Sequence, residues 1–209
     1  MMPFDVVGTG PGHPDYLIPL AKTILSQAQC LVASPRLLKM FGQEEQEQLE
    51  YHGNLHEVLD FIDARRQSGG LVVAVSGDPG FHSLLGAISK RFHKHEYRVI
   101  PGLSSVQVAA AASGEPWQGD LLVSSHGMAF DEKAVLGALQ NHQRVIFLTD
   151  QKRTPFVLAR WLEEKGFGER EAWAGAHLTW NEEQVLQCRV NELSKMDEGK
   201  GALWVLMVR

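Results

Sequence analysis

Residues 71–75 read Leu-Val-Val-Ala-Val and form an apolar run without polar residues at alternate positions. A strand with one face in water alternates apolar and polar residues, whereas a strand covered on both faces does not. Such double cover is typical of parallel sheets, because parallel strands are joined by crossover connections that are usually helices. The run therefore predicts a central strand of an α/β fold.

The strand-then-helix pattern recurs on both sides of this run. Apolar runs predict strands at 4–7, 30–33 and 97–100, and apolar residues spaced by three and four predict helices around them. Residues 43–50 are rich in Gln and Glu, and we expect a solvated helix or loop there. Together these features predict a first α/β domain with a parallel sheet at residues 1–115.

The pattern changes at residues 113–119, where two glycines and a proline predict a linker. The strands expected beyond it lie at 121–124, 145–148, 184–190 and 202–208. The last two segments alternate more, as antiparallel strands do. We therefore expect a second α/β domain with a mixed sheet at residues 116–209, and a ligand cleft between the two domains.

Composition and charge exclude several classes of protein. The chain has 20 Lys and Arg against 25 Asp and Glu, a net charge of −5, so we expect no nucleic-acid partner. No apolar run approaches the roughly 18 residues that span a bilayer, and the first residues lack a signal-peptide pattern. Cys30 and Cys188 have no metal-binding spacing and are expected to be free thiols. These features predict a cytoplasmic protein without a membrane partner or a bound metal.

Three glycine-containing loops directly follow three of the predicted parallel strands. They read Gly8-Thr9-Gly10-Pro11-Gly12, Ser76-Gly77-Asp78-Pro79-Gly80 and Pro101-Gly102-Leu103-Ser104-Ser105. Glycine admits positive φ and lets a ligand approach the backbone closely. Because the carboxyl ends of parallel strands share one edge of the sheet, where open α/β folds bind ligands, we expect one crevice built from these loops.

Each loop also has a purely structural interpretation. The first can be a simple glycine turn. Two features argue against a dinucleotide-binding loop there: the spacing is G-x-G-x-G instead of G-x-G-x-x-G, and no Asp or Glu follows the strand at 30–33 to hold a ribose. Asp78 is expected to cap the N-terminus of the following helix. Ser104 or Ser105 is expected to cap the next one.

The three loops, in this order and spacing, resemble the tetrapyrrole (corrin/porphyrin) methylase family over essentially the whole chain. The resemblance implies S-adenosylmethionine as methyl donor, S-adenosylhomocysteine as product, a tetrapyrrole as acceptor, and a homodimer. Within the family, Ser34-Pro35-Arg36 with Leu37-Leu38, the form Ser-Gly-Asp-Pro-Gly-Phe and His126-Gly127 resemble the members that methylate C5 of cobalt-precorrin-7 in cobalamin synthesis. Those members resemble the N-terminal half of fused precorrin-6Y methylases, so a separate enzyme for C15 methylation and decarboxylation is implied.

The resemblance also implies which residues contact the cofactor. Residue by residue, it carries over to Pro11, Ser76, Gly77, Asp78, Phe81, Ser104, Ser105, Leu148, Ala176 and His177. Leu148 would contribute a backbone contact from the end of a strand. Thr149 stands where many relatives have glycine, which makes that segment a departure from the family pattern.

The implied reaction needs positioning more than a protein nucleophile. The leaving group of the donor is a neutral thioether, so the protein has to hold the methyl in line with the acceptor carbon at about 3–3.5 Å and exclude water. Our hypothesis is that Asp78 orients the cofactor loop instead of acting as a base. Asp78 and His126 are the candidate catalytic residues, with His13 and His82 as further candidates for assisting proton loss.

The acceptor carries several carboxylates, so its site should contain cations. Arg36, Lys152 and Arg153 follow predicted strand ends and are candidates, although such side chains are often solvated surface charges. Other functions stay open. They are a methylase of the same fold acting on another precorrin position or on the diphthamide precursor, a non-catalytic module that binds S-adenosylmethionine or a nucleotide, and an NAD(P)-dependent oxidoreductase.

Overall fold

The computed structural model describes residues 3–125, 130–196 and 203–209. It divides into two compact units, Met1–Ser104 and Ser105–Arg209, which are described separately below. The division falls before helix α5 (Ser105–Ser113), earlier than the predicted boundary at residue 115. The reason is the composition of α5: it buries Val106, Val108 and two alanines, and it packs on a strand of the second unit.

The first unit is a five-stranded sheet in which every neighbouring pair is parallel, in the order β3-β2-β4-β1-β5. Its strands are β1 (Phe4–Gly8), β2 (Cys30–Ala33), β3 (Glu47–Glu50), β4 (Leu71–Val75) and β5 (Tyr97–Ile100). Strand β4 is central and buried at all five positions, which confirms the prediction made from its unbroken apolar run.

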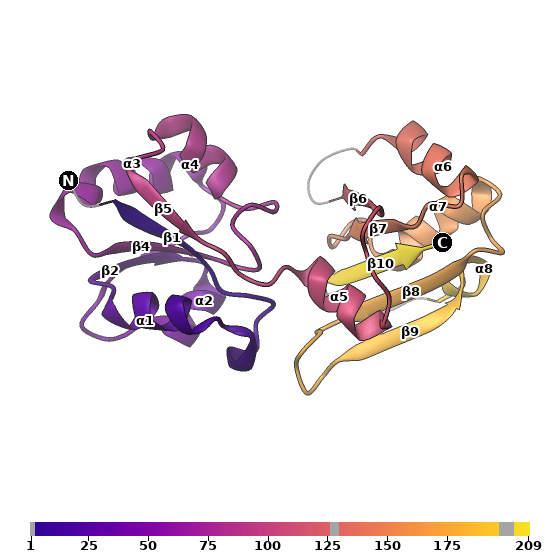
Figure 1. Cartoon of the computed structure of the whole chain (residues 1–209), viewed down its shortest axis with the longest axis horizontal. Helices are drawn as coiled ribbons and strands as arrows, with labels where there is room; N and C mark the ends of the chain where they lie inside the picture. Colours follow the sequence, from indigo (N-terminus) through magenta and orange to yellow (C-terminus); the bar gives the residue numbers. More distant parts are fainter. Residues whose placement is uncertain (1–2, 126–129, 197–202) are drawn as a thin grey trace. The chain divides into compact units, whose positions relative to one another are not determined.

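Helices cover both faces of this sheet (Figure 1). They are α1 (Pro19–Gln27), α2 (Pro35–Phe41), α3 (Leu55–Arg65) and α4 (Leu85–Arg91), with 3-10 turns at Pro14–Tyr16 and Arg66–Ser68. Residues of α1 and α2 share one core with one face of the sheet, and residues of α3 and α4 share a second core with the other face. The first unit is therefore the three-layer α/β structure expected from the sequence.

Two predictions for the first unit were wrong. Residues 47–50 form edge strand β3, which pairs with β2, because even a Gln- and Glu-rich segment completes the backbone hydrogen bonds of a neighbouring strand. Asp78 does not cap the following helix: α4 begins at Leu85, and the residue before it, Leu84, occupies the cap position. Several residues thus separate β4 from α4, and they form part of the candidate site.

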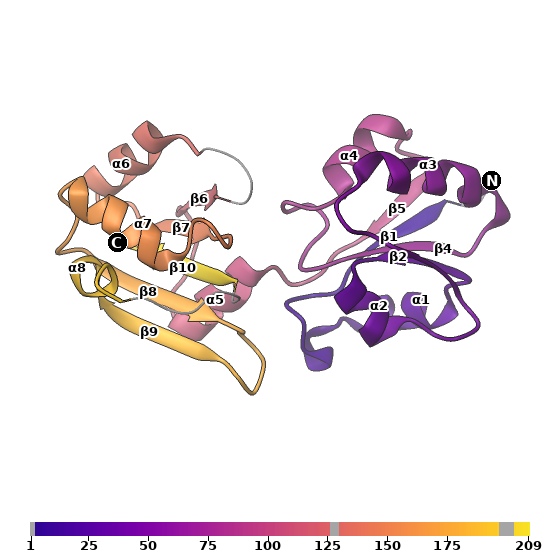
Figure 2. The same cartoon turned by 180° about the vertical axis from the view of Figure 1, so that it is seen from behind.

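The second unit has a mixed sheet in the order β6-β7-β10-β8-β9 (Figure 2). Its strands are β6 (Leu121–Ser124), β7 (Val145–Leu148), β8 (Glu171–Ala176), β9 (Gln184–Arg189) and β10 (Trp204–Val208). β6 and β7 are parallel, and the other pairs are antiparallel, which confirms the predicted mixed sheet. β10 does not alternate in burial as expected, because it is central and buried at every position.

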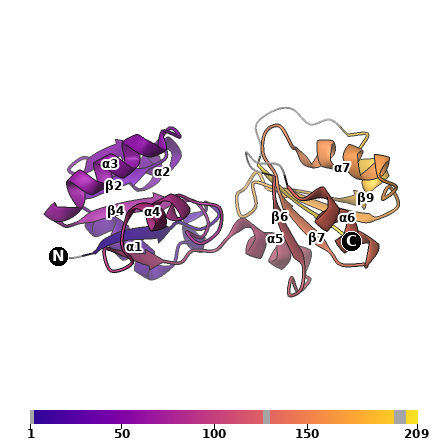
Figure 3. The ribbon, with the colours of Figure 1, turned by 90° about the horizontal axis from the view of Figure 1, so that it is seen from above.

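The helices of the second unit are α5, α6 (Glu132–Gln140), α7 (Pro155–Glu164) and the short α8 (Val190–Leu193). α6, α7 and α8 pack with one face of the sheet in a core that includes Phe147, Phe156 and Leu206. α5 lies beside β10 on the opposite face, and Figure 3 shows α5, α6 and α7 from above. No helix among the described residues is long and apolar enough to cross a membrane.

Candidate functional site

The carboxyl ends of β1, β4 and β5 meet at one edge of the first sheet. β1 and β4 are neighbours, yet the chain leaves β1 for α1 on one face and leaves β4 for α4 on the other. Such a reversal opens a crevice at the strand ends of doubly wound folds, where ligands bind. The prediction that the three glycine loops converge is confirmed by their mutual contacts.

The first two loops are joined directly through their backbones. Gly10 N donates to Gly77 O at 3.2 Å, and Gly77 N donates to Gly10 O at 2.8 Å. The side chain of Thr9 is buried and adds a bond from Oγ1 to Val75 O at 3.1 Å. Because Gly10 and Gly77 both have positive φ, a residue with a side chain would strain this bridge.

Close packing explains why positions 8 and 102 are glycine. A Cβ on Gly8 would lie 2.6 Å from Gly77 O and 2.7 Å from Gly102 N, and a Cβ on Gly102 would also overlap Gly77 O. The space at Gly77 is different, since a Cβ there would meet no atom closer than 3.8 Å. Gly8 and Gly102 are therefore packed against backbone, whereas the space beside the Cα of Gly77 is open.

Asp78 ties the second loop to the third. Its Oδ1 accepts from Gly80 N at 2.8 Å, and its Oδ2 accepts from Gly102 N at 3.1 Å. A carboxylate that accepts backbone N–H bonds with both oxygens is held in one orientation. This geometry favours the orienting role that we hypothesised for Asp78.

Ser76 is linked to the loop that follows β2. Arg36 lies in the first turn of α2, and its Nη2 donates to Ser76 Oγ at 2.9 Å. Both residues are exposed. Partial desolvation by the surrounding protein nevertheless lowers the pKa of the Arg36 guanidinium.

The remaining predicted residues of these loops are Pro11, Phe81, Ser104 and Ser105, the last of which begins the second unit. Pro11 follows Gly10, and Phe81 follows Asp78 by three positions, with its N donating to Asp78 O at 3.1 Å. Ser104 is buried, while Ser105 is half-buried at the start of α5. His82 packs edge-on against Phe81 and has a φ of 53°, a strained value for a residue with a side chain.

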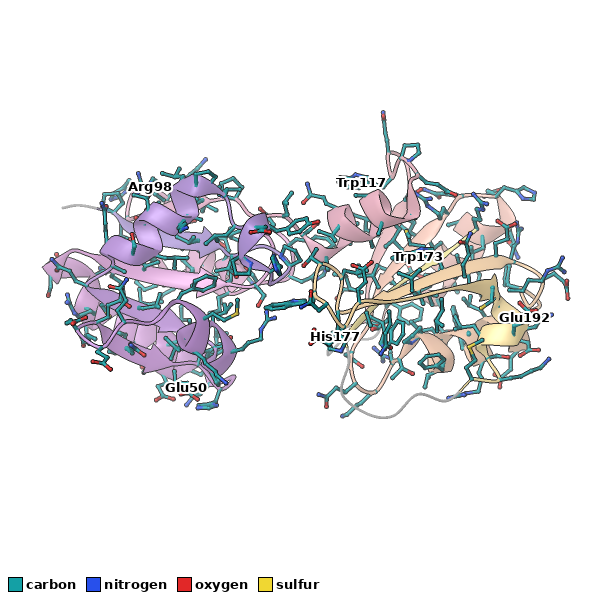
Figure 4. All side chains as sticks on the ribbon, turned by 90° about the horizontal axis from the view of Figure 1, so that it is seen from below. Glu50, Arg98, Trp117, Trp173, His177 and Glu192 are labelled. Carbon is teal, nitrogen blue, oxygen red and sulfur yellow. The ribbon has the colours of Figure 1, made fainter. Side chains whose placement is uncertain are left out.

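The second sheet brings its own predicted residues to one edge. β7 and β8 both pair antiparallel with β10, and the register places Leu148 opposite Val205 and Ala176 opposite Trp204. Leu148 and Ala176 therefore lie on either side of β10, one residue apart in register. His177, labelled in Figure 4, follows directly at the end of β8 and is exposed.

Other contacts at this edge limit what each residue can do. Leu148 O already accepts from Ser125 N at 2.9 Å and from Ser125 Oγ at 2.7 Å, so both of its acceptor positions are used. Thr149 donates its hydroxyl to Trp204 O at 2.8 Å and accepts from Trp204 N at 3.0 Å. Thr149 is thus a structural tie between β7 and β10.

The candidate cations of the second unit differ from Arg36. Arg153 donates to Ser125 O at 3.2 Å and lies over the ring of Phe130, with its Cζ 5.8 Å from the centroid. Lys152 is exposed in a turn closed by Asp150. His126, the other candidate catalytic residue, lies outside the described residues.

Sequence reasoning missed Thr179 in the loop after β8. Its Oγ1 is buried and has no hydrogen-bond partner among the described residues. No other buried side-chain nitrogen or oxygen of the described residues lacks a partner. Its φ of 79° is unusual for a β-branched residue, and its N donates to Glu183 Oε2 at 2.8 Å. No sequence pattern marks such a residue, because the feature depends on a local backbone conformation.

A doubly wound sheet with glycine loops at its switch point defines a class of α/β proteins that bind small ligands at their strand ends. The model of the tetrapyrrole (corrin/porphyrin) methylase family matches residues 4–194. This chain therefore belongs to the tetrapyrrole methylase family. No group of three or more metal-ligating side chains occurs in the described ranges.

Curated relatives of similar length extend the comparison. The chain is 29% identical over 196 residues to a probable cobalt-precorrin-7 C(5)-methyltransferase of Methanocaldococcus jannaschii, covering 92% of each chain. It is 32% identical over 182 residues to the cobalt-precorrin-7 C(5)-methyltransferase of Salmonella typhimurium, covering 86% of this chain and 87% of the relative.

Solved structures share the fold. The precorrin-6Y methylase of Archaeoglobus fulgidus superposes with a TM-score of 0.75 at 19% identity, covering 99% of this chain and 97% of that one. A uroporphyrin-III C-methyltransferase of Thermus thermophilus, complexed with S-adenosylhomocysteine, has a TM-score of 0.72 at 20% identity, covering 98% of this chain and 91% of that one.

Proposed function

We propose that this chain transfers a methyl group from S-adenosylmethionine to C5 of cobalt-precorrin-7 in cobalamin synthesis. One observation carries the proposal: the glycine loops converge at the switch point of a chain that is 32% identical to a cobalt-precorrin-7 C(5)-methyltransferase over most of its length. The fold alone does not select a substrate, because one fold hosts many functions.

The residues at the first sheet edge fit S-adenosylmethionine. Gly77 combines a φ of 68° with open space where a Cβ would stand, so a ligand can approach its Cα closely. The residues that would hold the cofactor are Pro11, Ser76, Gly77, Asp78, Phe81 and Ser104 in the first unit, and Ser105, Leu148, Ala176 and His177 in the second. Leu148 would contribute its half-buried side chain, since Ser125 occupies its carbonyl.

The protein's contribution to the reaction is positioning. S-adenosylmethionine, when bound, supplies a methyl group that is already activated by its sulfonium. Asp78 closes its own loop through its bond to Gly80 and holds that loop against the third through its bond to Gly102. Because both of its oxygens accept backbone bonds, Asp78 suits an orienting role better than that of a base.

The oligomeric state, the compartment and the pathway partner are part of the same proposal. The family resemblance supports a homodimer. The compartment that we propose is the cytoplasm. A separate enzyme would methylate C15 and decarboxylate the product, as the resemblance to one half of the fused precorrin-6Y methylases suggests.

The decisive experiment incubates the purified protein with S-adenosylmethionine and cobalt-precorrin-7. We expect stoichiometric S-adenosylhomocysteine and a product that carries one additional methyl group, assigned to C5 by NMR. Methylation at another position, or of a diphthamide precursor only, would identify a different methylase. Binding of S-adenosylmethionine without turnover of any tetrapyrrole would identify a non-catalytic module, and binding of NADH instead would indicate an oxidoreductase.

A further inference from the structure

Arg36 and Ser76 join two neighbouring strand ends of the first unit. Arg36 follows β2 and Ser76 follows β4, and these strands are hydrogen-bonded neighbours. The bond from Arg36 Nη2 to Ser76 Oγ, 2.9 Å long, connects residues 40 positions apart. A side chain in the first turn of α2 thus reaches the loop that we assign to the cofactor.

Arg36 differs from the other arginines of the first unit in its partners. Each of the others forms an ion pair with a carboxylate. These pairs are Arg65 with Glu47, Arg66 with Asp63 and Glu96, Arg91 with Asp63, and Arg98 with Asp5. Over residues 3–125, 130–196 and 203–209, Arg36 forms no ion pair with any carboxylate, and its hydrogen bond is to a neutral hydroxyl.

An arginine in this position retains most of its binding capacity. A guanidinium has five N–H donors in a planar fork, and the bond to Ser76 uses one nitrogen. The Arg36 side chain is exposed, so donors remain available on its solvent side. Its pKa is lowered by partial desolvation that no nearby carboxylate offsets, so a bound anion would be favourable.

The other two candidate cations lack this combination. Arg153 is engaged by Ser125 O and the ring of Phe130. Lys152 is fixed in its turn through its backbone N, and its ammonium lacks the planar fork that matches a carboxylate. Arg36 is therefore the cation best prepared to bind a planar anion at a strand end.

We propose that Arg36, held in place by Ser76, binds a carboxylate of the acceptor. The inference rests on the proposed function, because the acceptor class supplies the carboxylate. Ser76 belongs to the cofactor loop, so the same hydroxyl that orients Arg36 also connects the acceptor's anchor to the cofactor site. The bidentate geometry of a guanidinium would fix the orientation of the macrocycle as well as its affinity.

Binding measurements with stable probes test the site. Calorimetry would compare cobyrinic acid, a cobalt corrin with free carboxylates, with its methyl ester, which lacks them. We expect Arg36→Gln to lower the affinity for cobyrinic acid about tenfold or more, as for the loss of a charge-assisted hydrogen bond. Arg36→Lys should recover only part of the affinity, because it keeps the charge and loses the fork.

Controls separate this site from the proposed function. Arg91→Gln removes an exposed arginine that is paired with Asp63, and it should leave cobyrinic acid binding unchanged. S-adenosylhomocysteine should bind wild type and Arg36→Gln within about threefold of each other. Wild-type protein that fails to bind S-adenosylhomocysteine would count against the proposed function itself. Two results, each with normal S-adenosylhomocysteine binding, would overturn the carboxylate site alone. One is equal affinity of wild type and Arg36→Gln for cobyrinic acid. The other is wild type binding cobyrinic acid no more tightly than its methyl ester.

Discussion

Asp78 accepts a hydrogen bond from Gly102 N at 3.1 Å, and this bond joins the loops that follow β4 and β5. The same carboxylate accepts from Gly80 N at 2.8 Å, so one side chain closes its own turn and fixes the next loop. The two loops also meet through backbone packing at Gly77 and Gly102. The shape of the cofactor loop therefore depends on a carboxylate that reaches 24 residues along the chain.

Replacing Asp78 with Asn should weaken cofactor binding and turnover together. The amide keeps one acceptor oxygen but places an NH₂ group against a backbone N–H, which removes a charge-assisted bond at a cost of about 1.5–3 kcal/mol. We expect S-adenosylhomocysteine affinity and kcat/KM to fall by about ten- to a hundredfold in parallel. The measurements are calorimetry and initial rates. Turnover that collapses while S-adenosylhomocysteine affinity is unchanged would instead identify Asp78 as a base.

Alanine substitutions at Gly102 and Gly77 should distinguish a glycine required by close packing from one that leaves space for a ligand. Gly102→Ala inserts a Cβ into the Gly77 carbonyl, so we expect a loss of about 3 kcal/mol or more in the free energy of unfolding. Gly77→Ala has room but strains a positive φ, so it should cost only about 1–2 kcal/mol while reducing S-adenosylhomocysteine affinity.

A matched control exists in helix α6. A Cβ added at Gly137 would meet no atom within 4 Å beyond its own helix backbone, so Gly137→Ala should stabilise the protein by about 0.5–1 kcal/mol. Urea denaturation of the three variants gives the comparison. Equal stability of Gly102→Ala and Gly137→Ala would contradict the close packing at the switch point.

Removing the hydroxyl of Thr179 should not destabilise the protein. Thr179→Val keeps the shape and the strained backbone but deletes a buried oxygen that lacks a partner among the described residues. We expect the free energy of unfolding to stay level or to rise by about 1 kcal/mol, because an unsatisfied buried polar group is costly. Urea denaturation beside Thr179→Ser checks this. A loss of more than about 1 kcal/mol in the valine variant alone would mean that the hydroxyl is bonded.

Much of the first unit was predictable because its determinants are local. The unbroken apolar run at 71–75 specifies a doubly covered strand, and the loops after it are visible as glycine patterns. Strand β8 was missed, since Glu-Ala-Trp-Ala-Gly-Ala contains no β-branched residue, and its pairing with β9 and β10 is what makes it a strand. The Arg36–Ser76 bond is likewise a product of tertiary structure, because its partners lie on strands that become neighbours only in the folded sheet.

Arg144 should be essential to the stability of the second unit. Its guanidinium donates to Asp120 Oδ2 at 2.6 Å, and both side chains are only 10% exposed. Arg144→Met would leave the Asp120 carboxylate buried without this partner, which typically costs about 3–5 kcal/mol. We expect the free energy of unfolding, measured by urea denaturation, to fall markedly in Arg144→Met. Adding Asp120→Asn should recover part of this loss. A loss below about 1 kcal/mol would show that the ion pair contributes little.

Cys30 should make the protein less stable at alkaline pH. Burial raises the pKa of its thiol to about 11, from 9.0, with the carboxylate of Glu47 adding to the effect and Arg65 opposing it. Between these two values the unfolded chain releases the thiol proton and the folded chain keeps it, so the folded state binds more protons and stability falls as pH rises. The contribution is fully present below pH 9 and is lost towards pH 11.

We therefore expect the stability of wild type relative to Cys30→Ala to decrease by about 1 kcal/mol between pH 8 and pH 10, measured by urea denaturation. Lysines and tyrosines titrate equally in both proteins, so their effects cancel in the difference. Parallel stability curves for the two proteins would contradict the raised pKa.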